Sequence, residues 1–139
     1  MTDSNITKRE RDCIMCIQEG GKNGFPVRLI DIASMLHLKS PTVIAVLNRL
    51  KNKGFVRKEK GMVVLTDKGK EEYRQIANSH RILETLFYDA GVSLEDACKE
   101  ISNYDYMINP EELKKLSKFI GNPTKCPHGK PIPGGGSDD

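Results

Sequence analysis

Apolar residues recur at helical spacing between residues 31 and 53, in two short segments separated by a polar turn. In the second segment, the apolar positions from Val43 to Leu50 follow the i, i+3, i+4, i+7 order that places them on one helix face. Ser40 is a good N-cap residue, and Pro41 suits the first helical turn. After Gly54 come two short β-branched runs around a charged tip. Helix, turn, helix and hairpin predict a mainly α fold with a small β-hairpin wing, the winged helix-turn-helix.

Helical patterns also precede and follow this segment. Each begins at a residue that can cap the first turn with its side chain, and the helix after Ser93 is expected to continue as far as Ile108. We expect a winged helix-turn-helix domain over residues 1–68, a helical domain over 69–133 that dimerises to complete its core, and a disordered tail at 134–139. The expected caps are Thr7, Thr66 or Asp67, Ser93 and Asn109.

Charge is distributed unevenly along the 139 residues. Residues 1–60 hold 12 Lys or Arg against 6 Asp or Glu, whereas residues 61–139 hold 10 against 13. The basic half contains the helix-turn-helix, as a phosphate-binding surface requires, so we expect double-stranded DNA as a partner. Winged helices often have basic surfaces, and a winged helix used only in protein assembly is the alternative from another class.

The side chains expected near DNA fall into two groups. Those at the start and on the outer face of the second helix would read bases or fix the helix in the major groove. The others are basic and would mostly bind phosphate. The first group is Lys39, Ser40, Pro41, Thr42 and Asn48, and the second is Arg28, Arg49, Lys51, Arg57, Lys58 and Lys60.

Composition excludes several other classes of protein. With a mean hydropathy of −0.49 and no long apolar run, the sequence predicts no membrane span and no signal peptide, hence a cytoplasmic protein. The 4 cysteines do not resemble a secreted disulfide framework, which leaves free thiols or metal ligands. We find no nucleophile with a base, no phosphate-cradling glycine loop and no paired catalytic acids, and therefore do not expect an enzyme.

Three segments together resemble one known family. They are LIDIASMLHLKSPTVIAVLNRLKNKGFVRKEKGMVVLTDKG, SHRILETLF and GNPTKCPHGKPIP. Over residues 8–133 the chain is similar to the diphtheria-toxin-repressor and manganese-transport-regulator family of metal-dependent transcriptional repressors, in the short form without an SH3-like domain. The resemblance implies a homodimer that binds palindromic operators, with a divalent metal as corepressor.

The family's metal joins the first helix of the DNA-binding domain to the helices of the dimerisation domain. By the resemblance, Asp12 and Met15 fall at ligand positions of the first helix, and His80 with Glu84 matches an HxxxE pair. Residues at i and i+4 share a helix face, and imidazole with carboxylate suits Fe(II), Mn, Co or Zn. A metal that stiffens this connection would favour DNA binding, and by linkage DNA would tighten metal binding by the same factor.

The helix after the long one departs from the family pattern. Where members carry strong ligands, this chain has Ser102, Asp105 and Tyr106, of which only Asp105 is an obvious ligand. A phenol titrates near 10 and does not replace a neutral imidazole. Cys98 lies at an ancillary-site position, and with the HxxxE pair it would form a site whose sulfur favours Zn, Fe or Co over Mn.

This depleted ligand set leaves a second regulatory hypothesis open. A repressor of the same fold that has lost ordinary divalent sensing would respond to thiol oxidation or to an iron-sulfur cluster through Cys13, Cys16 and Cys98. Cys13 and Cys16 form a CxxC within a helix, which suits core packing as well as ligation. Cys126 and His128 belong to the CPHG signature, which we expect to pack the tail against the helical domain, with a ligand role as the alternative.

Overall fold

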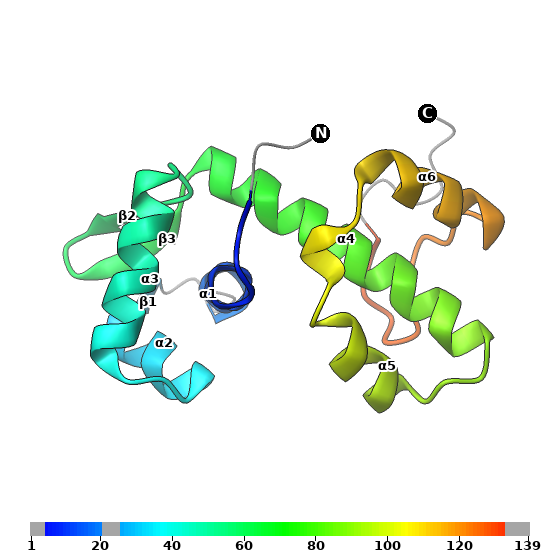
Figure 1. Cartoon of the computed structure of the whole chain (residues 1–139), viewed down its shortest axis with the longest axis horizontal. Helices are drawn as coiled ribbons and strands as arrows, with labels where there is room; N and C mark the ends of the chain where they lie inside the picture. Colours follow the sequence, from blue (N-terminus) through cyan, green and yellow to red (C-terminus); the bar gives the residue numbers. More distant parts are fainter. Residues whose placement is uncertain (1–4, 21–25, 133–139) are drawn as a thin grey trace. The chain divides into compact units, whose positions relative to one another are not determined.

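The chain forms two compact units, Ile6–Tyr73 and a second that starts at Arg74. The computed structural model describes residues 5–20 and 26–132, so the predicted tail at 134–139 lies outside the described residues. The division between the units falls inside one long helix, α4 (Asp67–Asp89), drawn in green in Figure 1. The predicted fold class, mainly α with a small hairpin, is confirmed.

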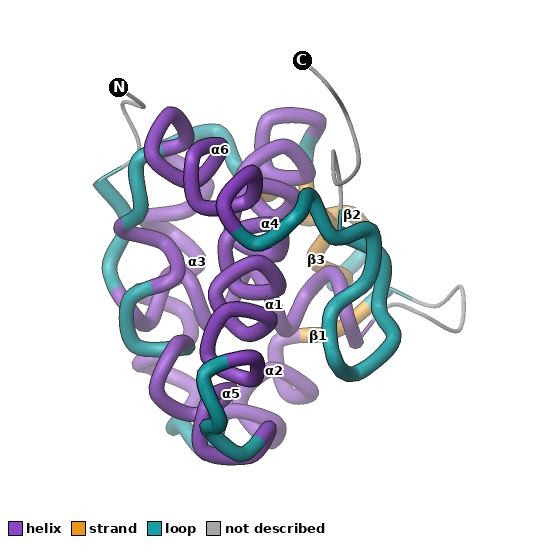
Figure 2. Tube along the Cα trace, turned by 90° about the vertical axis from the view of Figure 1, so that its right-hand side faces the viewer, coloured by secondary structure: helices purple, strands orange, loops and turns teal. Residues whose placement is uncertain are grey.

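The first unit packs three helices with a small sheet. The sheet is antiparallel with strand order β1-β3-β2, and Figure 2 shows its strands, in orange, next to one another. Val27 pairs with Val63, which adds a short strand that the sequence pattern did not predict. The elements are α1 (Lys8–Gly20), β1 (Val27–Arg28), α2 (Leu29–Leu36), α3 (Ser40–Asn52), β2 (Val56–Glu59) and β3 (Met62–Leu65).

Helix α3 confirms the predicted apolar face but not the predicted cap. Ser40 is the first helical residue, and the N-cap is Lys39, which has an extended backbone and makes no side-chain capping bond. The Lys39 carbonyl accepts from the backbone N–H of Thr42 and Val43 at 3.0 and 3.1 Å, so the helix begins one residue earlier than predicted. The residues of the buried face are Val43, Val46, Leu47 and Leu50.

The preceding helix, α2, begins at Leu29, two residues before the predicted start at Asp31. The Asp31 carboxylate accepts from the backbone N–H of Arg28 at 2.9 Å, so Asp31 lies in the first turn and caps the helix from inside. His37 ends α2 in a left-handed conformation with φ of 54°. The turn between the two helices is therefore short and well defined.

A buried ion pair cluster ties α1 to the last turn of α3. The predicted capping box is confirmed, since Glu10 Oε1 accepts from the Thr7 N–H at 2.8 Å and Thr7 Oγ1 accepts from the Glu10 N–H at 3.2 Å. Glu10 is fully buried and also accepts from Lys53 Nζ at 2.8 Å and from Arg49 Nε at 3.2 Å. A buried carboxylate must be compensated, so Glu10 fixes where the basic end of α3 lies.

The second unit contains the rest of α4 and three further helical segments. Ser93 caps α5 and Asn109 caps α6, as predicted, through side chains that accept from Asp96 N at 3.2 Å and Glu111 N at 2.8 Å. Thr66 likewise caps α4, with Oγ1 accepting from Gly69 N at 3.1 Å. The segments are α5 (Leu94–Ile101), the 3-10 turn η1 (Asp105–Met107) and α6 (Pro110–Phe119).

The expected continuous helix from Ser93 to Ile108 is wrong. Helix α5 ends at Ile101, and the Ser102 hydroxyl donates to the Cys98 carbonyl at 2.8 Å. Ser and Asn side chains compete with backbone hydrogen bonds, and the turns that follow use i to i−3 bonds instead. This break places η1, and with it Asp105, back against the long helix.

The C-terminal segment packs into this unit, as expected for the CPHG signature. Cys126 and Ile132 are buried in one apolar cluster with Ile82 of α4 and Leu113 of α6. The Cys126 N–H donates to the Lys130 carbonyl at 2.9 Å, which closes the segment into a tight loop. The segment is therefore part of the core and not an extended appendage.

Among the described residues, no single helix is long and apolar enough to cross a membrane. Only α2 and α3 taken together, bent by 112°, meet the length and composition of a span. Most of the apolar face of α3 is instead buried against its own unit.

The substitution Glu10→Gln is expected to destabilise the first unit by about 1–3 kcal/mol, because charged hydrogen bonds are lost from a buried position. Burial by itself raises the pKa of Glu10, but the bonds from Lys53, the Thr7 N–H and Arg49 outweigh it and hold the pKa below 4.5. The carboxylate's contribution is therefore present above the ordinary pKa and is lost as pH falls through the lowered one.

Urea unfolding of the wild-type and Glu10→Gln proteins at several pH values measures the loss of stability. The matched control is Glu59→Gln, which breaks an exposed ion pair with Arg57 and should change stability by less than about 1 kcal/mol. Equal effects of the two substitutions would contradict a structural role for Glu10.

Candidate metal centre

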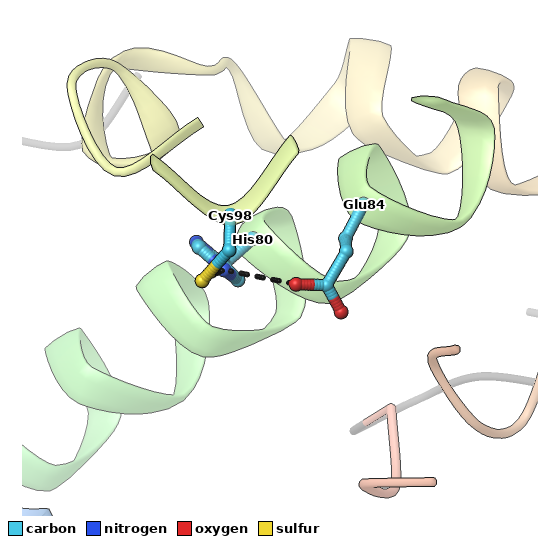
Figure 3. Close-up of side chains that lie close together, drawn as sticks. All are labelled: His80, Glu84 and Cys98. Atoms are coloured by element: carbon cyan, nitrogen blue, oxygen red, sulfur yellow. Dashed lines mark hydrogen bonds and ion pairs between the residues drawn. The ribbon is translucent and has the colours of Figure 1, made fainter. Parts of the chain in front are cut away.

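Three predicted metal-ligand residues meet in the second unit. His80 and Glu84 lie one turn apart on α4, and Cys98 comes from α5 (Figure 3). His80 Nε2 is 3.4 Å from Glu84 Oε2 and 3.5 Å from Cys98 Sγ. One nitrogen, one oxygen and one sulfur donor all lie within 4.8 Å of one another. The HxxxE pair and the cysteine thus form the sulfur-containing cluster that the sequence predicted.

The spacing of these donors fits a single transition-metal ion. A tetrahedral ion with bonds of about 2.0–2.3 Å to nitrogen, oxygen and sulfur holds its donors roughly 3.3–3.6 Å apart. The two distances from His80 Nε2, 3.4 Å to Glu84 and 3.5 Å to Cys98, lie in that range. The three side chains could therefore hold such an ion without a large rearrangement.

Burial strengthens the case for a cation at this place. Glu84 is only 1% exposed, and the His80 side chain is 13% exposed. A buried carboxylate next to an imidazole nitrogen and a thiol forms a group of electron-pair donors, which a cation compensates. On its other side, His80 Nδ1 lies 2.9 Å from Asp105 Oδ2, and Asp105 is 1% exposed.

Glu84 also faces a second donor group, Cys126 and His128, for which the CPHG signature predicts mainly packing of the C-terminal segment. Glu84 Oε1 is 2.8 Å from His128 Nδ1, and Cys126 completes a second set of three donors within 4.8 Å. The 2.8 Å contact is a hydrogen bond, shorter than the spacing of two ligands on one ion. The Cys-x-His spacing within CPHG was the available signal, since thiol and imidazole are the donors that zinc and iron prefer.

The other predicted ligands have different surroundings. Asp12 belongs to the first unit, where its carboxylate accepts from Lys8 Nζ at 2.7 Å and from Arg11 Nη1 at 2.9 Å. Met15 is half-buried on the same helix. Ligand roles for Asp12 and Met15 remain predictions.

The two residues that replace family ligands, Ser102 and Tyr106, also belong to the second unit. Ser102 is half-buried and donates its hydroxyl to the Cys98 carbonyl, and Tyr106 is half-buried in η1. Ser102 therefore supports the position of Cys98 through the backbone.

The CxxC cysteines lie in the core of the first unit. Cys13 is fully buried and Cys16 is 9% exposed, with its sulfur 3.8 Å from Met35 Sδ. Burial raises the pKa of Cys13 to about 12 and that of Cys16 to about 11. A raised pKa disfavours the reactive thiolate, and among the described residues neither cysteine belongs to a group of three His, Cys, Asp or Glu donors, so the structure favours packing over redox or cluster chemistry at this pair.

The residues predicted to meet DNA all belong to the first unit and are mostly exposed. Thr42 is half-buried, and Arg28 lies in β1, next to the hairpin. Two of the basic side chains have acidic partners, since Arg49 donates to Glu10 and Arg57 Nε donates to Glu59 at 2.7 Å. The exposed members are Arg28, Lys39, Ser40, Pro41, Asn48, Arg49, Lys51, Arg57, Lys58 and Lys60.

The sequence of this chain is similar to those of known proteins. Residues 66–134 match the family described as "Iron dependent repressor, metal binding and dimerisation domain". The iron-dependent repressor IdeR of Mycobacterium tuberculosis is 30% identical over 105 residues, which cover 74% of this chain and 46% of the relative. The chain belongs to the iron-dependent repressor family. The resemblance found in the sequence is thereby confirmed.

Solved structures of similar proteins agree with the fold. The crystal structure of IdeR from T. acidophilum superposes with a TM-score of 0.75 at 27% identity, covering 93% of this chain and 60% of that one. The protein SSo2273 from Sulfolobus solfataricus gives a TM-score of 0.78 at 29% identity, with 92% and 99% covered. The chain spans about half the length of the curated repressors it matches.

Thiol reactivity should separate the core cysteines from Cys98. In the folded, metal-free protein, Cys13 and Cys16 are expected to resist alkylation by iodoacetamide at pH 8, because their thiols are buried and protonated, while half-buried Cys98 reacts faster. Peptide mass spectrometry over time measures each site. All four cysteines should react in denaturant, and rapid labelling of Cys13 in the folded protein would contradict its core position.

Proposed function

We propose that this chain is a metal-dependent transcriptional repressor that acts as a homodimer on palindromic double-stranded DNA in the cytoplasm. The observation that carries the proposal is the convergence of His80, Glu84 and Cys98 at metal-ligand spacing. It lies within the segment that matches a metal-binding and dimerisation domain. The mycobacterial relative named above is an iron-dependent repressor, which supports a regulatory and not an enzymatic role.

The donor set favours some metals over others. A set of one imidazole, one carboxylate and one thiolate is softer than the oxygen-rich sites that suit Mn. We therefore infer Fe(II), Co or Zn as the preferred ions, with Fe(II) as the corepressor supported by the name of the mycobacterial relative. Mn is the weaker alternative within the same proposal.

The residues of the site connect two helices of the second unit. His80 and Glu84 present their donors from α4, and Cys98 presents its sulfur from α5. A bound ion would supply a cross-link between these two helices. Less motion on the protein side lowers the ordering cost of binding DNA.

The DNA-binding part of the proposal rests on α3 and the wing. The apolar face of α3 is buried, so its exposed face, with Asn48 and Lys51, is available to a major groove. Lys58 and Lys60 at the wing are exposed and suit phosphate contacts. Arg49 has a second role, because Glu10 holds it against α1.

Loss of the Glu84 carboxylate should remove both metal binding and its effect on DNA. In Glu84→Gln we expect Co(II) affinity to fall by more than the roughly 10–100-fold typical of losing an outer-shell partner. Titration of metal-free protein with Co(II), followed by visible absorption, measures affinity. Fluorescence anisotropy measures binding to a duplex selected from a random library by the Co(II)-loaded protein.

The matched control is Glu95→Gln, the same change at an exposed position of α5, which should leave both measurements unaltered. In the wild-type protein the selected duplex should tighten Co(II) binding by the same factor by which Co(II) tightens DNA binding. A Glu84→Gln protein whose DNA affinity still rises with Co(II) would contradict the proposal.

Salt dependence tests the assignment of the wing to phosphate. We expect Lys58→Ala to weaken binding to all duplexes by a similar factor and to reduce the slope of log affinity against log salt by about 1. Asn48→Ala should instead reduce the preference for the selected duplex over a scrambled one. Lys114→Ala, on exposed α6 surface, is the control. DNA binding without salt dependence, or none at all, would favour a protein-interaction module.

A further inference from the structure

Asp105 has a position that differs from that of a metal ligand. Its carboxylate is 1% exposed, and Oδ2 lies 2.9 Å from His80 Nδ1, on the side of the ring away from Nε2. Nε2 is the atom that faces Glu84 and Cys98. We propose that Asp105 is a positioning residue that holds the His80 ring with Nε2 directed into the metal site, and is not itself a ligand of that ion. The inference rests on the proposed metal-binding function.

Ring geometry supports this assignment. An ion bound about 2 Å beyond Nε2 would lie roughly 6 Å from an oxygen that is hydrogen-bonded to Nδ1, far outside a metal–oxygen bond. An ionised carboxylate only accepts hydrogen bonds, so Nδ1 must donate its hydrogen to Asp105 Oδ2. In the neutral imidazole, Nε2 then carries the lone pair that a metal requires. Asp105 thus selects the tautomer as well as the orientation of His80.

The path of the chain explains why Asp105 can reach this position. Helix α5 ends at Ile101, three residues of turn follow, and η1 starts at Asp105. A helix continued through this segment would present residue 105 one turn further along α5, away from its actual place beside His80. The break that Ser102 accompanies, through its bond to the Cys98 carbonyl, therefore serves both Cys98 and Asp105.

The expected effect is that of an outer-shell partner. Carboxylates that accept from the second nitrogen of a ligating histidine raise its basicity and fix its ring, and their loss typically lowers metal affinity about 10–100-fold. A direct ligand would have a further effect, because its removal changes the number and type of donors on the ion. Affinity and the spectrum of the bound ion therefore separate the two roles.

The test compares Co(II) binding to wild-type, Asp105→Asn and Asp96→Asn proteins by visible absorption. We expect Asp105→Asn to lower affinity 10–100-fold while the spectrum at saturation, including the sulfur-to-cobalt band from Cys98, keeps its position and intensity. Asp96→Asn, the same change at an exposed position of α5, should leave affinity unaltered. An altered spectrum at saturation, or unchanged affinity, would overturn the proposal.

A second measurement does not depend on the folding of a variant. The nitrogen-15 shifts of the His80 ring in metal-free wild-type protein report which nitrogen carries hydrogen. The Nδ1–H tautomer, or a doubly protonated ring that becomes Nδ1–H as pH rises, supports the proposal, whereas an Nε2–H ring overturns it. Failure of wild-type protein to bind Co(II) would instead overturn the proposed function itself.

Discussion

The helical unit is organised around one buried negative charge. Glu84 is 1% exposed, and its two oxygens face different imidazoles, that of His80 on its own helix and that of His128 in the C-terminal segment. Removing a carboxylate from water is unfavourable by several kcal/mol unless donors or cations compensate it. The Glu84 carboxylate therefore constrains the positions of α5 and of the segment that contains His128, and it is also a donor of the candidate metal site.

The first unit, Ile6–Tyr73, also contains a buried carboxylate. Glu10 is a second buried carboxylate, compensated by Lys53 and Arg49 from α3 and by the Thr7 N–H. Here the carboxylate orients a helix, and its hydrogen-bond partners within the described part of the chain are a backbone N–H, a guanidinium and an ammonium group. Glu10 thus fixes the basic end of α3 in the first unit, and Glu84 lies beside an imidazole and a thiol in the second.

Sequence reasoning succeeded where a local pattern decides the structure. The apolar spacing of α3, the capping residues Ser93 and Asn109, and the i, i+4 pair His80–Glu84 are properties of single helices, and the structure confirms them. The family resemblance predicts Cys98 as a ligand, whereas no local sequence pattern predicts that α5 packs against α4.

Sequence patterns did not predict the contacts between segments that are far apart along the chain. The buried position of Glu10 depends on side chains 39 and 43 residues away, and the contact of His128 with Glu84 spans 44 residues. The early end of α5 was missed because the apolar periodicity continues through Tyr104 and Ile108, while the competing hydroxyl of Ser102 is a weak signal. The contact of Asp105 with His80 Nδ1, across 25 residues, is of the same kind, and it is this contact that makes Asp105 a positioning residue and not a ligand.

The loop closed between Cys126 and Lys130 has a consequence for how the chain can be shortened. Because Cys126 and Ile132 form one wall of the apolar cluster around Ile82 and Leu113, proteolytic trimming at the turn after α6 would open that cluster to water. The same cut would detach His128 from Glu84 and leave a buried charge with one imidazole fewer. Residues 126–132 are therefore required for the packing of the helices that precede them.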